Sequence, residues 1–116
     1  MNTQNKPMTI IISSDTFGNG PKELGEMLLK NYIYTLTELK PLPKSIIFLN
    51  SGAFMTSIDS NALEDLRSLE ARGVHILTCG SCIDYFKLKD KLAVGQITNM
   101  YKIAEEMAKA DNLVSI

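Results

Sequence analysis

The sequence is poor in the residues that staple small proteins or bind metals: its 116 residues include two cysteines, one histidine and no tryptophan. Two cysteines cannot build a disulfide scaffold. A structural zinc site needs four ligands, and the chain offers three, so only a site shared between two subunits would be complete. We therefore predict no metal site, and the two thiols are judged by their position in the chain.

Excess charge and long apolar runs are also absent. Twelve Lys and Arg residues face thirteen Asp and Glu residues, which gives a net charge of -1. No basic run is available to neutralise a phosphate backbone. No apolar run approaches the roughly 18 residues that span a bilayer, and residues 1–7 lack the apolar centre of a signal peptide. The sequence therefore predicts a cytoplasmic protein that binds neither nucleic acid nor a membrane.

The composition that remains is typical of one globular domain, expected over residues 1–116. Hydrophobic residues make up 45% and charged residues 22%, close to the average for folded proteins. Strands are expected at 8–13, 45–49, 74–78, 96–98 and 113–116. Helices are expected from Pro21 to before Pro41, from about 60 to 72, from near Cys82, and from Asn99 to about 109. This alternation predicts an α/β fold, a three-layer α/β/α domain with a five-stranded parallel sheet, because parallel strands need crossover helices.

The first helix is expected to bury one apolar face. Leu24, Leu28, Tyr32 and Leu36 recur at helical spacing, with Met27 beside them. We interpret these side chains as core.

The two cysteines lie three residues apart, as Cys79-Gly80-Ser81-Cys82. Cys79 ends a predicted strand and Cys82 opens a predicted helix, so both are expected where helix-end amides favour the thiolate. The spacing would allow a disulfide or the passage of a sulfur atom between the two thiols. The alternative is that both cysteines only pack, since free cysteine is commonly buried.

Other known uses of such residues fit less well. A thioredoxin-like motif would lie early in the chain and face a later cis-proline, whereas no proline follows Pro43. His75 lies four residues before Cys79 on the same strand, about 13 Å away, and is interpreted as structural.

Gly18 and Gly20 follow the first strand, but Glu23 stands where a dinucleotide fingerprint needs a third glycine. We therefore predict no cofactor.

Polar residues in the loops after the strands are the remaining candidates, because ligands of parallel α/β sheets gather there. We predict an anion-binding or partner-binding role for Ser14, Asp15 and Asn19 in the first loop. Asn50 after the second strand, Tyr85 beyond the second cysteine and Asn99 after the fourth strand complete the set of predicted ligand-binding or partner-binding residues.

The stretch from Arg72 to Phe86, with Cys79-Gly80-Ser81-Cys82-Ile83-Asp84-Tyr85 as its most specific part, resembles the DsrE-like domain of YedF-type proteins. The similarity continues through 88–95 and 98–100 and includes the turn at 50–52, so it covers nearly the whole chain. That family is linked to sulfur and selenium metabolism. The resemblance implies the DsrE/DsrF/DsrH-like fold and assembly into homo- or hetero-oligomers.

The resemblance also implies a role for the first thiol. In sulfur-relay members, a cysteine at the end of this strand carries a persulfide received from a TusA-like donor. Cys79 falls at that position, with Cys82 as an added partner. YedF-type proteins usually carry an N-terminal TusA-like domain, for which this chain has no room, so the donor would be a separate chain.

Three functional hypotheses follow for the thiol pair. The first is a small cytoplasmic, sulfurtransferase-like carrier of sulfur or selenium, which needs no organic cofactor and forms a homo-oligomer. The second is a non-catalytic ligand-binding or assembly module, which burial of both sulfurs would support. The third is a redox enzyme of the disulfide-exchange type.

Overall fold

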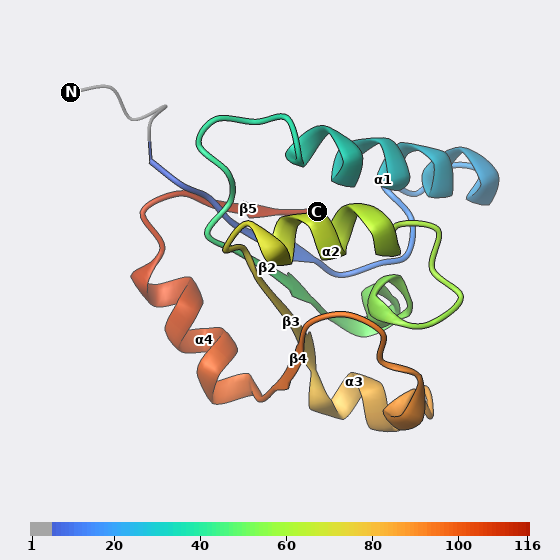
Figure 1. The fold of residues 1–116 in the computed structure, drawn as a ribbon. Helices are drawn as coiled ribbons and strands as arrows, with labels where there is room; N and C mark the ends of the chain where they lie inside the picture. The colour runs from blue at the N-terminus through green and yellow to red at the C-terminus, as the bar shows by residue number, and fades with distance from the viewer. Residues whose placement is uncertain (1–5) are drawn as a thin grey trace.

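Five parallel strands form one sheet in the order β4-β3-β2-β1-β5 in the computed structural model, which describes residues 6–116 (Figure 1). The strands are β1 (Thr9–Ile12), β2 (Ser45–Phe48), β3 (His75–Cys79), β4 (Gln96–Thr98) and β5 (Leu113–Ser115). The five predicted strand positions and the parallel sheet are confirmed, with strand ends that differ by at most one residue. The expected lack of a signal peptide concerns residues 1–7, of which 1–5 lie outside the described part of the chain.

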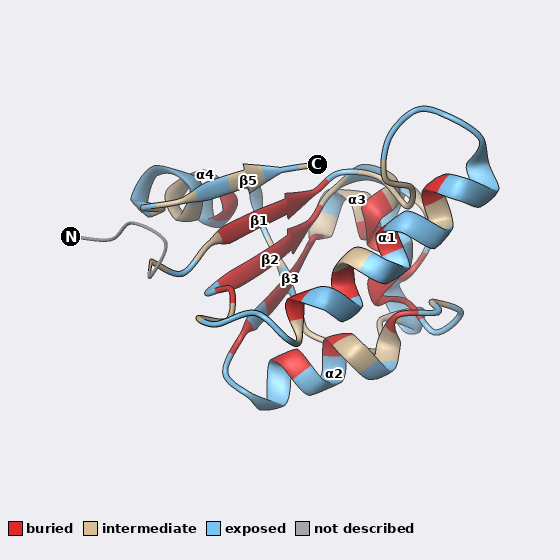
Figure 2. Cartoon of the chain, turned by 90° about the horizontal axis from the view of Figure 1, so that it is seen from above, coloured by how far each residue is buried: buried red, intermediate tan, exposed pale blue. Residues whose placement is uncertain are grey.

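The helices lie on both faces of the sheet. The α-helices are α1 (Lys22–Leu36), α2 (Leu63–Ala71), α3 (Gly80–Tyr85) and α4 (Met100–Lys109), and the 3-10 helices are η2 (Asn50–Thr56) and η3 (Lys89–Lys91). Figure 2 shows α1 and α2 on one side of the sheet and α4 on the other. The three-layer α/β/α prediction is thus confirmed. In residues 6–116 no helix is both long and apolar enough to cross a bilayer.

The central strands are buried on both faces because alternate side chains enter two different cores. Ile10, Ile12, Ile46 and Phe48 join the larger core, to which α1 and α2 contribute. Ile11, Ile47, Leu77 and Cys79 join a smaller core, in which Ile103 is the one fully buried side chain of α4. Continuous runs of Ile and Phe suit such strands, since every position meets apolar side chains. Cys79 therefore points to the side of the sheet that carries α4.

The buried face of α1 differs from the predicted one. The helix buries Gly25, Leu29, Ile33 and Leu36, whereas Leu24, Met27 and Leu28 are 47%, 58% and 41% exposed. Leu36 is buried as predicted, and Tyr32 is half-buried and packs against the larger core. The other predicted residues lie one position out of phase with the buried ones, so the pattern alone fits either face. Gly25 selects the observed face, because a Cβ at this position would lie 2.7 Å from the Thr16 side chain.

The predicted loop at 50–60 is partly helical, because η2 occupies its first half. The turn starts at Asn50, whose φ of 52° is in the left-handed region that asparagine tolerates better than most residues. Gly52 then lies against β1, where any Cβ would collide with the carbonyl oxygen of Ile12. This close approach requires glycine and brings the start of η2 to the carboxyl end of the sheet.

Candidate thiol site

The two cysteines lie where β3 passes into α3. Cys79 is the last residue of β3 and the N-cap residue of α3, and Cys82 follows in the first turn of that helix. Gly80 permits the sharp change of direction, since a Cβ there would lie 3.2 Å from both the Ile97 side chain and the Thr98 carbonyl oxygen of β4. Both thiols are free. The strand-to-helix junction predicted from the sequence is therefore present.

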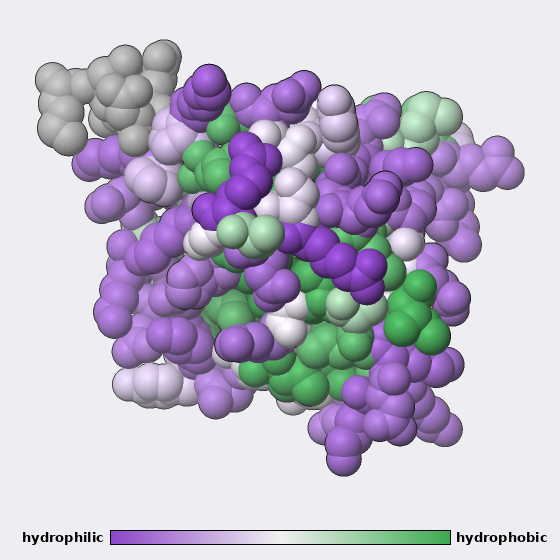
Figure 3. Space-filling view, viewed as in Figure 1, coloured by the Kyte–Doolittle hydropathy of each residue, from purple (hydrophilic) through white to green (hydrophobic). Residues whose placement is uncertain are grey.

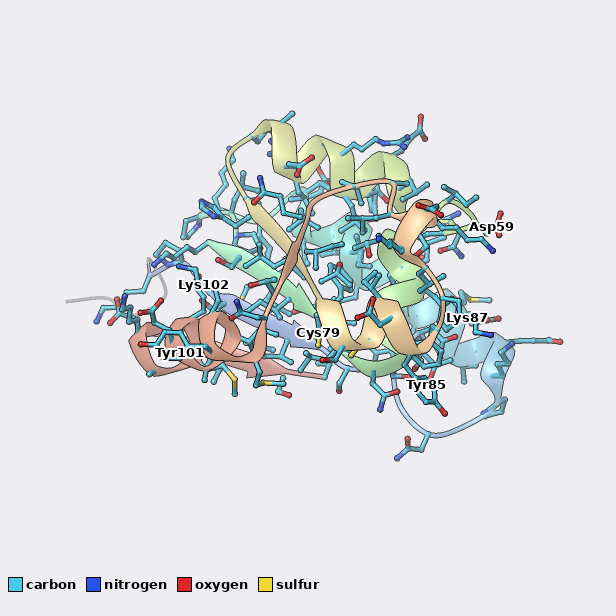
Figure 4. All side chains as sticks on the ribbon, turned by 90° about the horizontal axis from the view of Figure 1, so that it is seen from below. Asp59, Cys79, Tyr85, Lys87, Tyr101 and Lys102 are labelled. Atoms are coloured by element: carbon cyan, nitrogen blue, oxygen red, sulfur yellow. The ribbon has the colours of Figure 1, made fainter. Side chains whose placement is uncertain are left out.

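Both cysteines line one open, largely apolar cavity of about 540 Å³. Cys79 is only 3% exposed, whereas Cys82 is half-buried. Figure 4 shows Cys79 between helices α3 and α4, with Tyr85 on the α3 side and Tyr101 on the α4 side. The remaining lining residues are Leu49, Asn50, Ser81, Tyr85, Phe86 and Met100. A reagent that reaches Cys79 has to enter through this cavity.

The Cys82 thiol is held by the turn after β2. The backbone N–H of Asn50 donates a hydrogen bond to Cys82 Sγ over 3.1 Å. That N–H is in place because Gly52 brings η2 against β1 and donates its own N–H to the Leu49 carbonyl at 2.8 Å. Two segments far apart in the sequence, 49–52 and 79–82, are thus joined at a sulfur atom.

Burial raises the pKa of the Cys82 thiol, and its hydrogen bond and charge interaction with Cys79 raise that pKa further. The Asn50 N–H acts in the opposite direction, but the net shift is upward. The expectation that both thiols lie where the thiolate is favoured is therefore wrong for Cys82. Desolvation and the adjacent sulfur outweigh the helix-end amides. Cys82 remains protonated at neutral pH, and its S–H is available as a donor toward Cys79.

Two of the predicted partner-binding residues lie at this cavity, and a third lies beside it. Asn50 and Tyr85 are lining residues, and Tyr85 is 78% exposed. Asn99 caps α4 instead, because its Oδ1 accepts the Lys102 N–H at 2.9 Å. The Asn99 side chain therefore stabilises the first turn of α4, the helix that borders the cavity.

The first loop does not join the thiol site. Ser14 Oγ accepts the Thr16 N–H at 3.0 Å, a local turn bond. Asp15 lines a separate cavity of about 350 Å³ with Glu26, Asp59, Lys91 and other residues, and Asn19 is exposed. The sequence places this loop at the carboxyl end of the sheet, and its cavity adjoins the thiol cavity at Phe86, which lines both. η2 contributes Asn50 to the thiol cavity and Met55 to the other.

Some lining residues were not identified from the sequence. Leu49 directly follows β2, and Met100 begins the helix that follows β4. The sequence signal that could have identified them is their position directly after parallel strands, because such residues lie together at one edge of the sheet. Phe86, which also lines the cavity, packs against both Phe54 and Tyr85, with ring centroids 4.8 Å and 5.1 Å apart.

His75 lies at the other end of β3 and lines a different cavity with Glu70 and Gln96. Its interpretation as a strand residue remote from the thiols is confirmed. Among residues 6–116, no group of three or more His, Cys, Asp or Glu side chains is arranged to hold a metal ion.

Comparison with known proteins identifies a family and a fold. The model of the DsrE/DsrF-like family matches residues 44–116, which include the whole thiol site. No curated protein matches the chain. The fold is similar to that of the YchN protein of Escherichia coli, with a TM-score of 0.75, 15% identity, and 96% of this chain and 99% of that chain covered.

Two further solved structures share the fold. MTH1491 from Methanobacterium thermoautotrophicum, a protein of unknown function, has a TM-score of 0.71 at 16% identity, with 96% of this chain and 99% of that chain covered. BT1422 from Bacteroides thetaiotaomicron, also of unknown function, has a TM-score of 0.63 at 15% identity, with 94% of each chain covered.

Proposed function

The chain belongs to the DsrE/DsrF-like family, and on that premise we propose that it carries sulfur, or selenium, as a persulfide on Cys79 in a cytoplasmic relay. The observation that carries this proposal is the placement of Cys79 in an open cavity with a second, protonated thiol beside it. Burial of both sulfurs would have favoured a module with incidental thiols, but Cys82 is half-buried and both thiols line the cavity.

Loading is a thiol exchange without net oxidation. The Cys79 thiolate attacks the outer sulfur of a donor persulfide, the donor S–S bond breaks, and the donor cysteine leaves as a thiolate. Cys82 donates its S–H to the sulfur at Cys79 and stabilises negative charge there. Delivery to an acceptor thiolate is the same exchange in reverse.

Cys82 also offers a route for release. Its thiolate attacks the inner sulfur of the Cys79 persulfide, hydrosulfide leaves, and a Cys79–Cys82 disulfide forms. A dithiol reductant then has to supply two electrons to restore the pair. The high pKa of Cys82 keeps this route slow at neutral pH, so that the persulfide persists until an acceptor binds.

The donor in this proposal is a separate TusA-like protein that docks over the cavity. The surface around the opening suits such contact, since Tyr85, Met100 and Ile97 are 78%, 60% and 50% exposed. Figure 3 shows hydrophobic residues gathered over β4 and the segment that leads into it. Exposed aromatic and methionine side chains are enriched where proteins associate.

Mass spectrometry after incubation with a cysteine desulfurase and cysteine tests the proposal. The parent and Cys82→Ser should gain the mass of one sulfur atom at residue 79, and Cys79→Ser should not. If Cys79→Ser accepts sulfur as well as the parent does, Cys79 is not the carrier. Absence of added sulfur, with slow alkylation of both thiols, would favour the non-catalytic binding module instead. The cavity beside Asp15 would then be the place to search for its ligand.

A further inference from the structure

Three sulfur-bearing side chains surround the thiol cavity. Cys79 ends β3, Cys82 lies in the first turn of α3, and Met100 is the first residue of α4. All three residues line the same cavity. The register of the sheet brings α4 to the thiols, because Cys79 pairs with Thr98 of β4 and Met100 follows two residues later. The fold therefore places two thiols and a thioether around one space.

The two thiols lie side by side. Their side chains form a hydrogen bond with each other, and neither cysteine is in a disulfide. The backbone N–H of Asn50 also donates to Cys82 Sγ over 3.1 Å. Hydrogen bonds to an ionised acceptor are stronger than those to a neutral one. The Asn50 N–H therefore stabilises negative charge on this sulfur when a ligand displaces its proton.

Met100 supplies a thioether on a fixed backbone. Its position is held by the cap of α4, because Asn99 Oδ1 accepts the Lys102 N–H at 2.9 Å. The Met100 side chain itself is 60% exposed. Methionine is unbranched and has three rotatable bonds, so its sulfur adapts to a ligand beside it. Met100 thus offers a third sulfur to a ligand that binds both thiols.

The chemistry of these ligands selects one class of ion. Among residues 6–116, those that line this cavity include no charged side chain. Mg²⁺ and Ca²⁺ prefer carboxylate and carbonyl oxygens, and a structural Zn²⁺ site takes four ligands. Thiolate and thioether sulfurs are soft ligands that select Cu(I). We propose that Cys79, Cys82 and Met100 bind one Cu(I) ion. The prediction of no metal site from the sequence counted only cysteine and histidine toward a zinc site.

Binding exchanges protons for the metal ion without any oxidation. Both S–H bonds break, the two protons pass to solvent, and each thiolate forms a bond to Cu(I). The Met100 thioether adds a lone pair and loses no proton. A Cys79 thiolate bound to Cu(I) is not free to attack a donor persulfide. Metal binding and the proposed sulfur loading therefore exclude each other at this cavity.

Competition with the chromophoric Cu(I) chelator bicinchoninate tests the site, without oxygen and with ascorbate present. The parent should remove one equivalent of Cu(I) from the chelator, also in the presence of excess Zn²⁺. Cys79→Ser and Cys82→Ser each leave one thiolate and should lose this capacity. Loss of even an outer-shell partner costs about 10–100-fold in metal affinity. Met100→Leu, which keeps an apolar side chain of similar size, should therefore weaken binding by at least about tenfold.

Met107→Leu is the matched control. Met107 lies on the same helix and is 41% exposed, but it does not line the cavity. This variant should bind Cu(I) as the parent does. X-ray absorption at the copper edge should show three sulfur neighbours in the parent and two in Met100→Leu. Circular dichroism confirms that each variant is folded.

Three results would overturn the metal site. The first is a parent that leaves all Cu(I) on the chelator. The second is equal affinity of Met100→Leu and Met107→Leu, and the third is equal affinity of the parent and both cysteine variants. Mass spectrometry of the same variants measures sulfur loading separately. A chain that gains sulfur but no copper would therefore refute the metal site alone.

Discussion

Replacing Gly52 with alanine tests how the turn after β2 holds the thiol site. A Cβ at this position would collide with the Ile12 carbonyl oxygen and lie 3.4 Å from the Ser14 nitrogen. That carbonyl oxygen already accepts the Leu49 N–H at 2.9 Å. The added methyl group can be accommodated only if η2 moves away from β1, because the atoms it meets are backbone.

The cost of this movement can be estimated from its parts. Overpacking a tight interior costs about 1–3 kcal/mol, and weakening one backbone hydrogen bond adds about 0.5–1.5 kcal/mol. The lower chain entropy of unfolded alanine returns about 0.4–1 kcal/mol. The net destabilisation of Gly52→Ala is therefore about 1–4 kcal/mol, which lowers the Tm by about 4–16 °C for a domain of this size.

Thermal and urea unfolding followed by circular dichroism measure this loss. Gly20→Ala is the matched control, because no atom lies within 4 Å of its added Cβ, and its Tm should stay equal or rise slightly. If Gly52→Ala and Gly20→Ala melted at the same temperature, the contact with Ile12 would not hold the turn, and the placement of the Asn50 N–H at Cys82 would need another explanation.

Three further predictions concern α4, α1 and the second thiol. Asn99→Ala removes the helix cap and should lower the free energy of unfolding in urea by about 1 kcal/mol, whereas Asn99→Asp keeps a capping oxygen and should not lower it. If the two variants were equally stable, the cap would have no role. Leu29→Ala should cost about 2–5 kcal/mol and the exposed Leu28→Ala less than about 1 kcal/mol in dilute protein, whereas equal losses would contradict the buried face of α1. Because the folded pKa of Cys82 is raised, its contribution to stability is complete below the unfolded pKa of about 8.5 and is lost as the pH rises through the folded pKa. The stability difference between the parent and Cys82→Ala should therefore fall as the pH rises above the unfolded pKa, and a difference that stays constant there would contradict the shift.

The sheet could be predicted from the sequence because its signals are local and agree with one another. The runs 9–12 and 45–48 are short, apolar and rich in isoleucine, which favours strands covered on both faces. Their alternation with helical segments then leaves a parallel sheet as the simplest fold. The position of Cys79 at the end of β3 follows from the same pattern. The DsrE/DsrF-like family is confirmed, whereas the closer resemblance to YedF-type proteins stays a prediction.

The errors concern contacts between segments far apart in the sequence. The face of α1 depends on Gly25 meeting Thr16, and hydrophobic periodicity does not contain that contact. The predicted binding role of Asp15 stays a prediction, but its distance from the thiols could not be read from the sequence, since its N–H bonds to Ser51 Oγ at 3.2 Å and it lines a second cavity. The upward shift in the pKa of Cys82 depends on burial that involves 49–50 and α3 together. The position of Cys82 in the first turn of α3 would by itself predict a lowered pKa.

The unequal helical layers give the two faces of the sheet different resistance to local opening. The α4 layer holds its side of the sheet with one fully buried residue, Ile103, whereas α1 alone contributes Leu29, Ile33 and Leu36. Segments with few buried contacts open at lower free energy than the whole protein unfolds. Amide hydrogens of α4 should therefore exchange before those of α1. Since Cys79 lies on the α4 side, its reactivity toward a bulky reagent reports on this opening without unfolding of the rest of the chain.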